Sequence, residues 1–200
     1  MTRPGFARSA SLAMAMALIL PSVALSHPGH TGSWAESWAD GLGSGWAHPL
    51  GGMDHVLAMV GVGLLAARLK GRWLWALPAT FVLAMLGGAA GGAAGWGAAP
   101  WLAESGIAAS VFAFGLLATF GKSLPRGWIA GATALFGALH GSAHGAETPA
   151  GGSTAAYFVG FTLGTLVLHA VGLGAGVALA QVRRASALAR GARRTASSLN

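Results

Sequence analysis

The sequence contains no cysteine and few charged residues. The absence of cysteine excludes disulfide bonds, thiolate metal ligands and a cysteine nucleophile. Only 8% of the 200 residues are Asp, Glu, Lys or Arg, whereas 54% are hydrophobic. Soluble domains carry about 25% charged residues, so this composition argues against a water-soluble fold. We therefore expect a protein that is embedded in a lipid bilayer.

Acidic residues are especially scarce, with 5 Asp and Glu against 12 Lys and Arg, which gives a formal net charge of +7. A basic balance of this size raises the question of nucleic-acid binding. The basic residues, however, lie in short clusters between apolar segments rather than along one stripe. That distribution is typical of a membrane orientation signal. We therefore expect a lipid bilayer as partner and no nucleic acid.

Residues 1–26 have the pattern of a cleavable signal peptide. Arg3 and Arg8 precede a short apolar core, and Pro21 ends it. Ala24 and Ser26 are small residues at the two positions that a signal peptidase recognises. An uncleaved anchor helix is the alternative interpretation.

The fold class that we predict is all-α, a polytopic membrane helix bundle with five transmembrane helices after the signal peptide. A span needs about 20 mostly apolar residues. Five segments meet this requirement: 47–67, 73–95, 105–121, 127–144 and 154–181. The expected organisation is a signal peptide at 1–26, a transmembrane domain at 27–182 and a basic cytoplasmic tail at 183–200.

The segments between these expected spans alternate in charge. No Lys or Arg occurs in 27–46, 96–104 or 145–153. The basic residues follow the first, third and fifth spans: Arg68, Lys70 and Arg72; Lys122 and Arg126; Arg183, Arg184, Arg190, Arg193 and Arg194. Because cytoplasmic loops carry the excess of Lys and Arg, we expect an external amino terminus and a cytoplasmic carboxyl terminus.

Polar residues interrupt the first expected span. A charged Asp at the centre of a bilayer costs about 2.5–3.5 kcal/mol on insertion scales, yet His48, Asp54 and His55 lie in this segment. Seven residues are two helical turns, so the two imidazoles are expected on one face, about 10 Å apart along the axis. Pro49 fits the first turn of this helix. Asp54 can either reach the same cavity as the imidazoles or orient one of them as a second-shell partner.

A second polar cluster ends the fourth expected span. His140 and His144 are four residues apart and therefore share one helix face. Glu147 follows at the outer mouth. Both clusters would lie at similar depth on the external side, which predicts one shared site for a divalent metal ion. The expected ligands are His48, Asp54, His55, His140, His144 and Glu147.

Three further histidines are weaker candidates. His27 and His30 would follow the cleaved signal, either as an external metal-capture arm or as solvated histidines without a role. His169 lies toward the cytoplasmic side of the fifth span, where it is either a structural hydrogen-bonding residue or an exit ligand. Imidazole and carboxylate ligands suit Ni, Co, Zn or Cu(II).

These two clusters resemble the signatures of the HupE/UreJ family of bacterial hydrogenase and urease accessory permeases. One signature is a His, five residues and Asp-His in the first mature span, here His48 to His55. The other is a Phe-His-Gly-x-Ala-His-x-x-Glu-like stretch, here residues 139–147. Leu139 replaces the Phe, which affects packing rather than ligation. The resemblance extends over essentially the whole chain.

The resemblance implies a transporter of the inner membrane rather than an enzyme. Its expected substrate is Ni²⁺, or Co²⁺ as in some members, supplied to NiFe hydrogenase or urease, and no prosthetic group is expected. An intramembrane metal-dependent hydrolase and a non-transporting protein that hands metal to a partner are the alternatives. The sequence leaves open the choice between nickel and cobalt and the oligomeric state, a homo-oligomer included.

Overall fold

The structure, a computed structural model, describes residues 38–146 and 153–197, and within these ranges every regular element is helical. The all-α fold class is thereby confirmed. The expected signal peptide, His27, His30 and Glu147 lie outside the described residues. The helices are α2 (Trp38–Gly51), α3 (Met53–Leu69), α4 (Trp73–Ala93), α5 (Pro100–Phe120), the short 3-10 helix η1 (Gly121–Ser123), α6 (Arg126–Ala146) and α7 (Thr154–Ser197).

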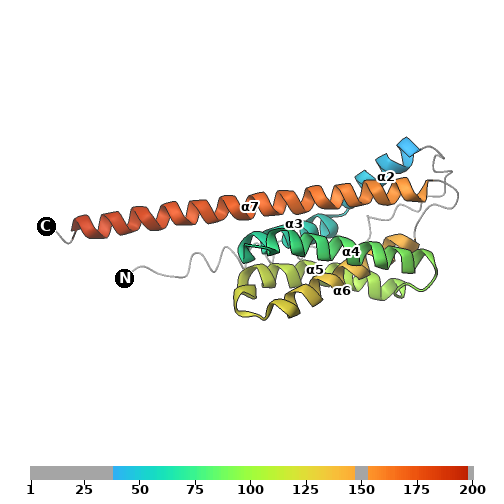
Figure 1. Ribbon diagram of the computed structural model, residues 1–200, viewed down its shortest axis with the longest axis horizontal. Helices are drawn as coiled ribbons and strands as arrows, with labels where there is room; N and C mark the ends of the chain where they lie inside the picture. The colour runs from blue at the N-terminus through green and yellow to red at the C-terminus, as the bar shows by residue number, and fades with distance from the viewer. Residues whose placement is uncertain (1–37, 147–152, 198–200) are drawn as a thin grey trace.

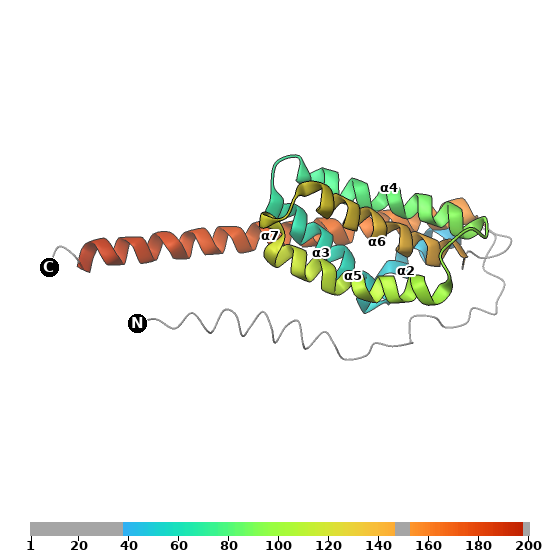
Figure 2. The ribbon, with the colours of Figure 1, turned by 90° about the horizontal axis from the view of Figure 1, so that it is seen from below.

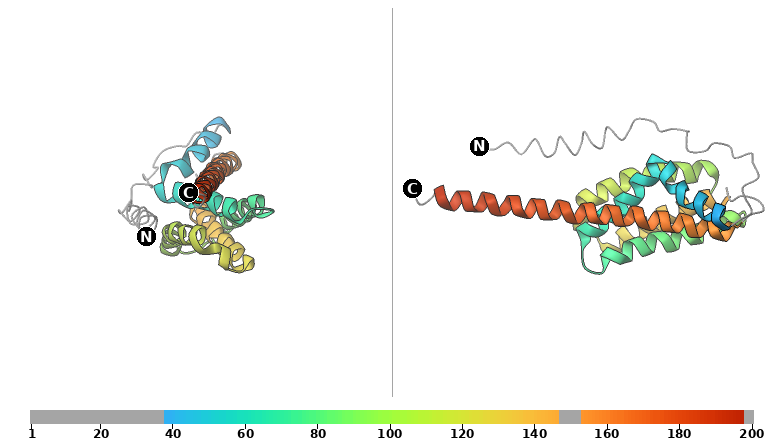
Figure 3. Two further views of the ribbon diagram at one scale, coloured as in Figure 1. Left: turned by 90° about the vertical axis from the view of Figure 1, so that its left-hand side faces the viewer. Right: turned by 90° about the horizontal axis from the view of Figure 1, so that it is seen from above.

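Helices α3 to α6 and the first half of α7 form a bundle of rods that run roughly along one direction (Figures 1 and 2). Helix α4 packs mainly on α6, whereas α7 packs mainly on α2 and α3. The second half of α7 projects far beyond the bundle, as the right-hand view of Figure 3 shows. The helix runs through residue 182 without a break, so the expected tail at 183–200 begins inside a continuous helix.

Three helices in the described part of the chain are long and apolar enough to cross a membrane, and α2 with α3 can form a fourth span as a bent pair. The three are Trp73–Ala93, Pro100–Ser123 and Thr154–Gly191. Helix α6 has 21 residues but contains Arg126, His140, Ser142 and His144, which lower its apolar character. The structure thus supports three to four candidate spans, and the fifth stays a prediction.

The first expected span is not one straight helix. The chain bends by 84° between α2 and α3, and Gly52 at the break is extended, with φ −111° and ψ 123°. Consecutive glycines at 51 and 52 are poor helix formers, which explains why the helix breaks here. Pro49 consequently lies near the end of α2, and its expected place in a first helical turn is wrong.

Glycines let the helices approach each other backbone to backbone. A Cβ at Gly141 or Gly145 of α6 would collide with the carbonyl oxygens of Met85 and Ala89 on α4. On α7, a Cβ at Gly172 would collide with the carbonyl oxygen of Val60 on α3. Close packing of small residues is a main source of helix association where lipid removes the hydrophobic drive. These contacts fix the positions of α3, α6 and α7, which carry four of the seven histidines.

Candidate metal site

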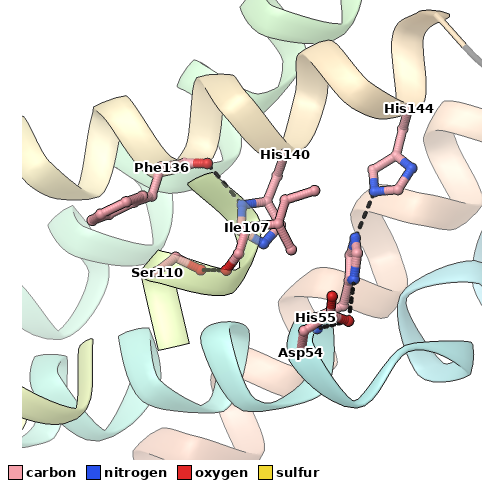
Figure 4. A network of polar contacts seen from close by, with 7 residues as sticks. All are labelled: Asp54, His55, Ile107, Ser110, Phe136, His140 and His144. Carbon is pink, nitrogen blue, oxygen red and sulfur yellow. Dashed lines mark hydrogen bonds and ion pairs between the residues drawn. The ribbon is translucent and has the colours of Figure 1, made fainter. Parts of the chain in front are cut away.

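His55 on α3 and His144 on α6 face each other in the bundle interior. Their Nε2 atoms are 2.7 Å apart. Both residues are buried: His55 is 4% exposed and His144 is 0% exposed. On the other side of its ring, His55 donates from Nδ1 to Oδ1 of Asp54 at 2.9 Å. Figure 4 shows this chain of three groups, with His55 in the middle. The structure thus joins the two clusters that the sequence places in different helices.

The hydrogen bond to Asp54 fixes the tautomer of His55. A carboxylate oxygen accepts the bond, so Nδ1 carries the proton and the lone pair of Nε2 points at His144. Metal–imidazole bonds of 2.0–2.1 Å place two nitrogens on one ion about 2.9–3.4 Å apart. The Nε2 atoms of His55 and His144, 2.7 Å apart, are only a few tenths of an ångström closer than two nitrogens on one ion. A small separation of the rings would therefore admit an ion between them.

Asp54 is held by the first turn of α3. Its Oδ1 accepts from the backbone N–H of His55 at 2.8 Å, in addition to the ring Nδ1. A carboxylate in the first turn also interacts favourably with the helix dipole. Such a carboxylate can orient an imidazole that binds a metal ion; that Asp54 has this role stays a prediction.

His140 lies one turn before His144 on α6 and is fully buried. Its Nδ1 donates to the carbonyl oxygen of Phe136 at 2.8 Å (Figure 4), so its Nε2 bears the lone pair. Within the described residues, this Nε2 has no hydrogen-bond partner. The ring centroid lies 5.2 Å from that of His55. The Nε2 of His140 is thus an available acceptor next to the His55–His144 pair.

His48 reaches the same place from α2, by way of the bend at Gly52. Its ring centroid lies 4.4 Å from that of His144 and 6.3 Å from that of His55. The expected separation of two turns along one straight helix is therefore wrong, because α2 and α3 are not collinear. The 84° bend brings His48 nearer to the other imidazoles than a continuous helix would.

Aromatic side chains that the sequence analysis did not single out surround these rings. Phe161 of α7 lies 4.8 Å from His144 and 5.8 Å from His48 between centroids. Tyr157, one turn earlier, lies 5.8 Å from His48, and Phe81 of α4 lies 5.3 Å from His140. Isolated aromatic residues in apolar helices carry no sequence signal for such a role.

The histidines and Asp54 of this region are not arranged as a complete metal-coordination shell in the structure. In residues 38–146 and 153–197, no group of three or more His, Asp or Glu side chains is arranged to hold a metal ion. His169 lies apart from the cluster and contacts Phe81 instead. We define His48, His55, His140 and His144, with Asp54, as the outer cluster. Whether these residues and Glu147 ligate metal stays a prediction.

The chain is similar to proteins of one known family. A family model described as HupE / UreJ protein matches residues 14–199. Protein HupE of Rhizobium leguminosarum bv. viciae is 37% identical over 158 residues, which are 79% of this chain and 78% of that protein. No solved structure matches this chain. Together with its apolar helices, these matches show a multi-pass membrane protein, and the chain belongs to the HupE/UreJ family.

Proposed function

We propose that the protein is a secondary transporter of the bacterial inner membrane that imports Ni²⁺, or Co²⁺, for the maturation of NiFe hydrogenase or urease. Membership of the HupE/UreJ family supports this assignment. The observation that carries it is the contact between His55 and His144 at 2.7 Å, with two more imidazoles beside it. Four histidines thus lie together in the bundle, three of them buried and His48 partly exposed. Glu147 would complete the site at the outer mouth.

The chemistry of the outer cluster suits a cargo ion. Neutral imidazoles and carboxylates are good ligands for nickel and cobalt. Asp54 supplies one negative charge toward the divalent ion and lies 31% exposed in its side chain, at the edge of the cluster. A transport site must bind strongly enough to replace hydration water and weakly enough to release the ion. Imidazoles with a single carboxylate meet both requirements better than a shell of several anionic ligands.

The charge distribution supports import. The α3–α4 and α5–α6 connections lie at the end of the bundle from which α7 projects (Figures 1 and 2). This end carries Arg68, Lys70, Arg72, Lys122 and Arg126, so we assign it to the cytoplasm and the outer cluster to the periplasmic half. A membrane potential that is negative inside favours entry by about 2.3 kcal/mol per charge per 100 mV. The potential alone can therefore drive a divalent cation inward.

The test is uptake of radiolabelled Ni²⁺ into proteoliposomes with an imposed potential. His55→Ala and His140→Ala are compared with wild type, with Co²⁺ as competitor. Thr133→Val is the matched control, since Thr133 is a buried polar residue of α6 whose hydroxyl donates to the carbonyl oxygen of Ile129 in its own helix. Uptake should be lost in both histidine variants and kept in the control. Wild-type vesicles that accumulate no more Ni²⁺ than empty ones would refute transport and favour the hydrolase or metal-handoff alternative.

A further inference from the structure

The side chain of His169 lies buried in the bundle interior. It belongs to α7 and is 2% exposed, and among the described residues neither of its ring nitrogens has a hydrogen-bond partner. Buried polar side chains are normally paired. Ionisable residues inside a membrane are costly and are retained mainly where they serve a function. The unpaired imidazole of His169 therefore indicates that it binds a ligand that is not part of the protein, such as a metal ion.

Two helices independently give the position of His169 along the bundle. On α7, it lies eight residues after Phe161, which contacts the His144 ring. On α3, Gly63 packs against the backbone oxygen of His169 and lies eight residues after His55. Eight helical residues span about 12 Å. Both helices thus place His169 about 12 Å further along the bundle than the level of His55 and His144, toward the end where α3 and α4 are connected.

Phe81 stands between His169 and the outer cluster. Its ring centroid lies 5.3 Å from that of His140 and 5.3 Å from that of His169, in edge-on arrangements. His140 is the member of the outer cluster whose Nε2 also has no hydrogen-bond partner in the described part of the chain. Two buried imidazoles with available nitrogens thus flank one phenyl ring. A phenyl ring is held by two side-chain torsions only and can turn aside.

Helices α4 and α7 are also in contact one turn away from the Phe81–His169 pair. Met85 follows Phe81 by one turn of α4, and Thr165 precedes His169 by one turn of α7. The Thr165 hydroxyl points at the Met85 sulfur at 3.9 Å, so the two helices face each other over both turns. The Phe81–His169 contact is therefore part of a continuous α4–α7 interface and not an isolated approach of two side chains.

We propose that His169 is a second, inner metal ligand, which receives the divalent cation from His140 when the Phe81 ring turns aside. This inference rests on the proposed transport function and adds a binding step to it. Ions that move between several weak sites leave each one readily. A separate inner imidazole would give the ion such a stage between the outer cluster and the cytoplasmic end.

A purely structural role makes a different prediction. If His169 only packs edge-on against Phe81, a phenyl ring at position 169 should serve equally well. His169→Phe therefore keeps the packing and removes the ligand. We expect Ni²⁺ uptake by this variant to fall at least about tenfold, because loss of a second-shell partner alone costs about 10–100-fold and a direct ligand should cost no less. Co²⁺ binding at the outer cluster, measured by calorimetry on the purified variant, should be unchanged.

A spectroscopic measurement tests contact with metal without relying on transport. The chain contains no cysteine, so His169→Cys introduces one sulfur ligand of a kind that binds cobalt well. Added Co²⁺ should give a cobalt–thiolate charge-transfer band in the near ultraviolet. Ala170→Cys is the matched control, because residue 170 is exposed on the outer face of α7 and should give no band.

The two measurements separate the possible failures. If wild type moves no Ni²⁺, the proposed transport fails, and the cobalt–thiolate band still reports whether metal reaches position 169. A band in His169→Cys together with reduced uptake in His169→Phe supports the inner ligand. The absence of the band in a folded His169→Cys protein that still binds Co²⁺ overturns it. Wild-type uptake by His169→Phe overturns it as well.

Discussion

His55 and His144 are separated by 89 residues in the chain, yet their Nε2 atoms lie 2.7 Å apart. The contact depends on how four helices are placed. Helix α6 is held against α4 by glycines that admit backbone contact, and α7 packs on α3 in the same way. A pair of imidazoles at this distance shares either a proton or a cation. The two histidines should therefore behave as one unit when metal binds.

A double-mutant cycle tests this unit. We expect His55→Ala and His144→Ala each to weaken Co²⁺ binding by more than the roughly 10–100-fold that loss of a second-shell partner costs. The double variant should bind little worse than either single variant, because both histidines would bind the same ion. Calorimetric titration of the purified protein measures the three affinities. Two losses that simply add would show that the residues act independently.

Two substitutions of Asp54 separate its two contributions to metal binding, the hydrogen bond to His55 and the negative charge. Asp54→Asn keeps an oxygen that accepts the His55 Nδ1–H bond but removes the charge, whereas Asp54→Ala removes both. We expect metal affinity to fall about 10–100-fold in the Asn variant and further in the Ala variant. The same titration measures both. An Ala variant with wild-type affinity would show that Asp54 neither orients His55 nor balances the charge of the ion.

The sequence predicted the helical bundle because hydrophobic length and loop charge are local properties. Four of the five expected spans correspond to helices whose bounds differ from the expected ones by a few residues, apart from the extension of α7 to Ser197. The proximity of the two clusters also followed from local information. Histidines at the outer ends of two oppositely directed helices share a depth, whatever the bundle looks like.

The sequence did not predict the break at Gly52 or the aromatic surroundings of the outer cluster. The Gly51-Gly52 pair was the available signal for a break, but glycines are common within membrane helices. Gly87, Gly91 and Gly95 have the four-residue spacing of a small helix-packing face, yet a Cβ at any of the three would meet nothing within 4 Å. Gly88, one residue along, faces α6 instead. Which side of a helix meets a neighbour depends on tertiary packing, and spacing alone does not reveal it.

The α4–α6 interface makes a prediction about stability. Gly141→Ala should destabilise the protein by about 1–3 kcal/mol, the usual cost of overpacking, because its Cβ would collide with the Met85 carbonyl oxygen. Gly131→Ala on the same helix is the control, since nothing lies within 4 Å of its Cβ. The control should be neutral or slightly stabilising, because alanine favours a helix by about 0.5–1 kcal/mol over glycine. Tryptophan fluorescence during heating in detergent measures both. Equal midpoints for the two variants would contradict the close approach of α4 and α6.

Gly52 links the helix break to the metal site. A Cβ at this position would lie 2.7 Å from Oδ1 of Asp54 and 3.0 Å from Nδ1 of His55. Those two atoms form the hydrogen bond that orients the His55 ring. The backbone at Gly52 is extended, a conformation that alanine adopts without strain. Gly52→Ala should therefore disturb the Asp54–His55 pair while leaving the fold intact.

Gly51→Ala is the matched control, because its Cβ would meet nothing within 4 Å. We expect Gly52→Ala to lose Co²⁺ affinity about 10–100-fold, as for the loss of a second-shell partner, with an unchanged melting temperature. Gly51→Ala should match wild type in both. Wild-type affinity in Gly52→Ala would mean that the pair tolerates the added methyl group and that its geometry does not set the affinity. A loss in both variants would instead assign the effect to the flexibility of the bend between α2 and α3.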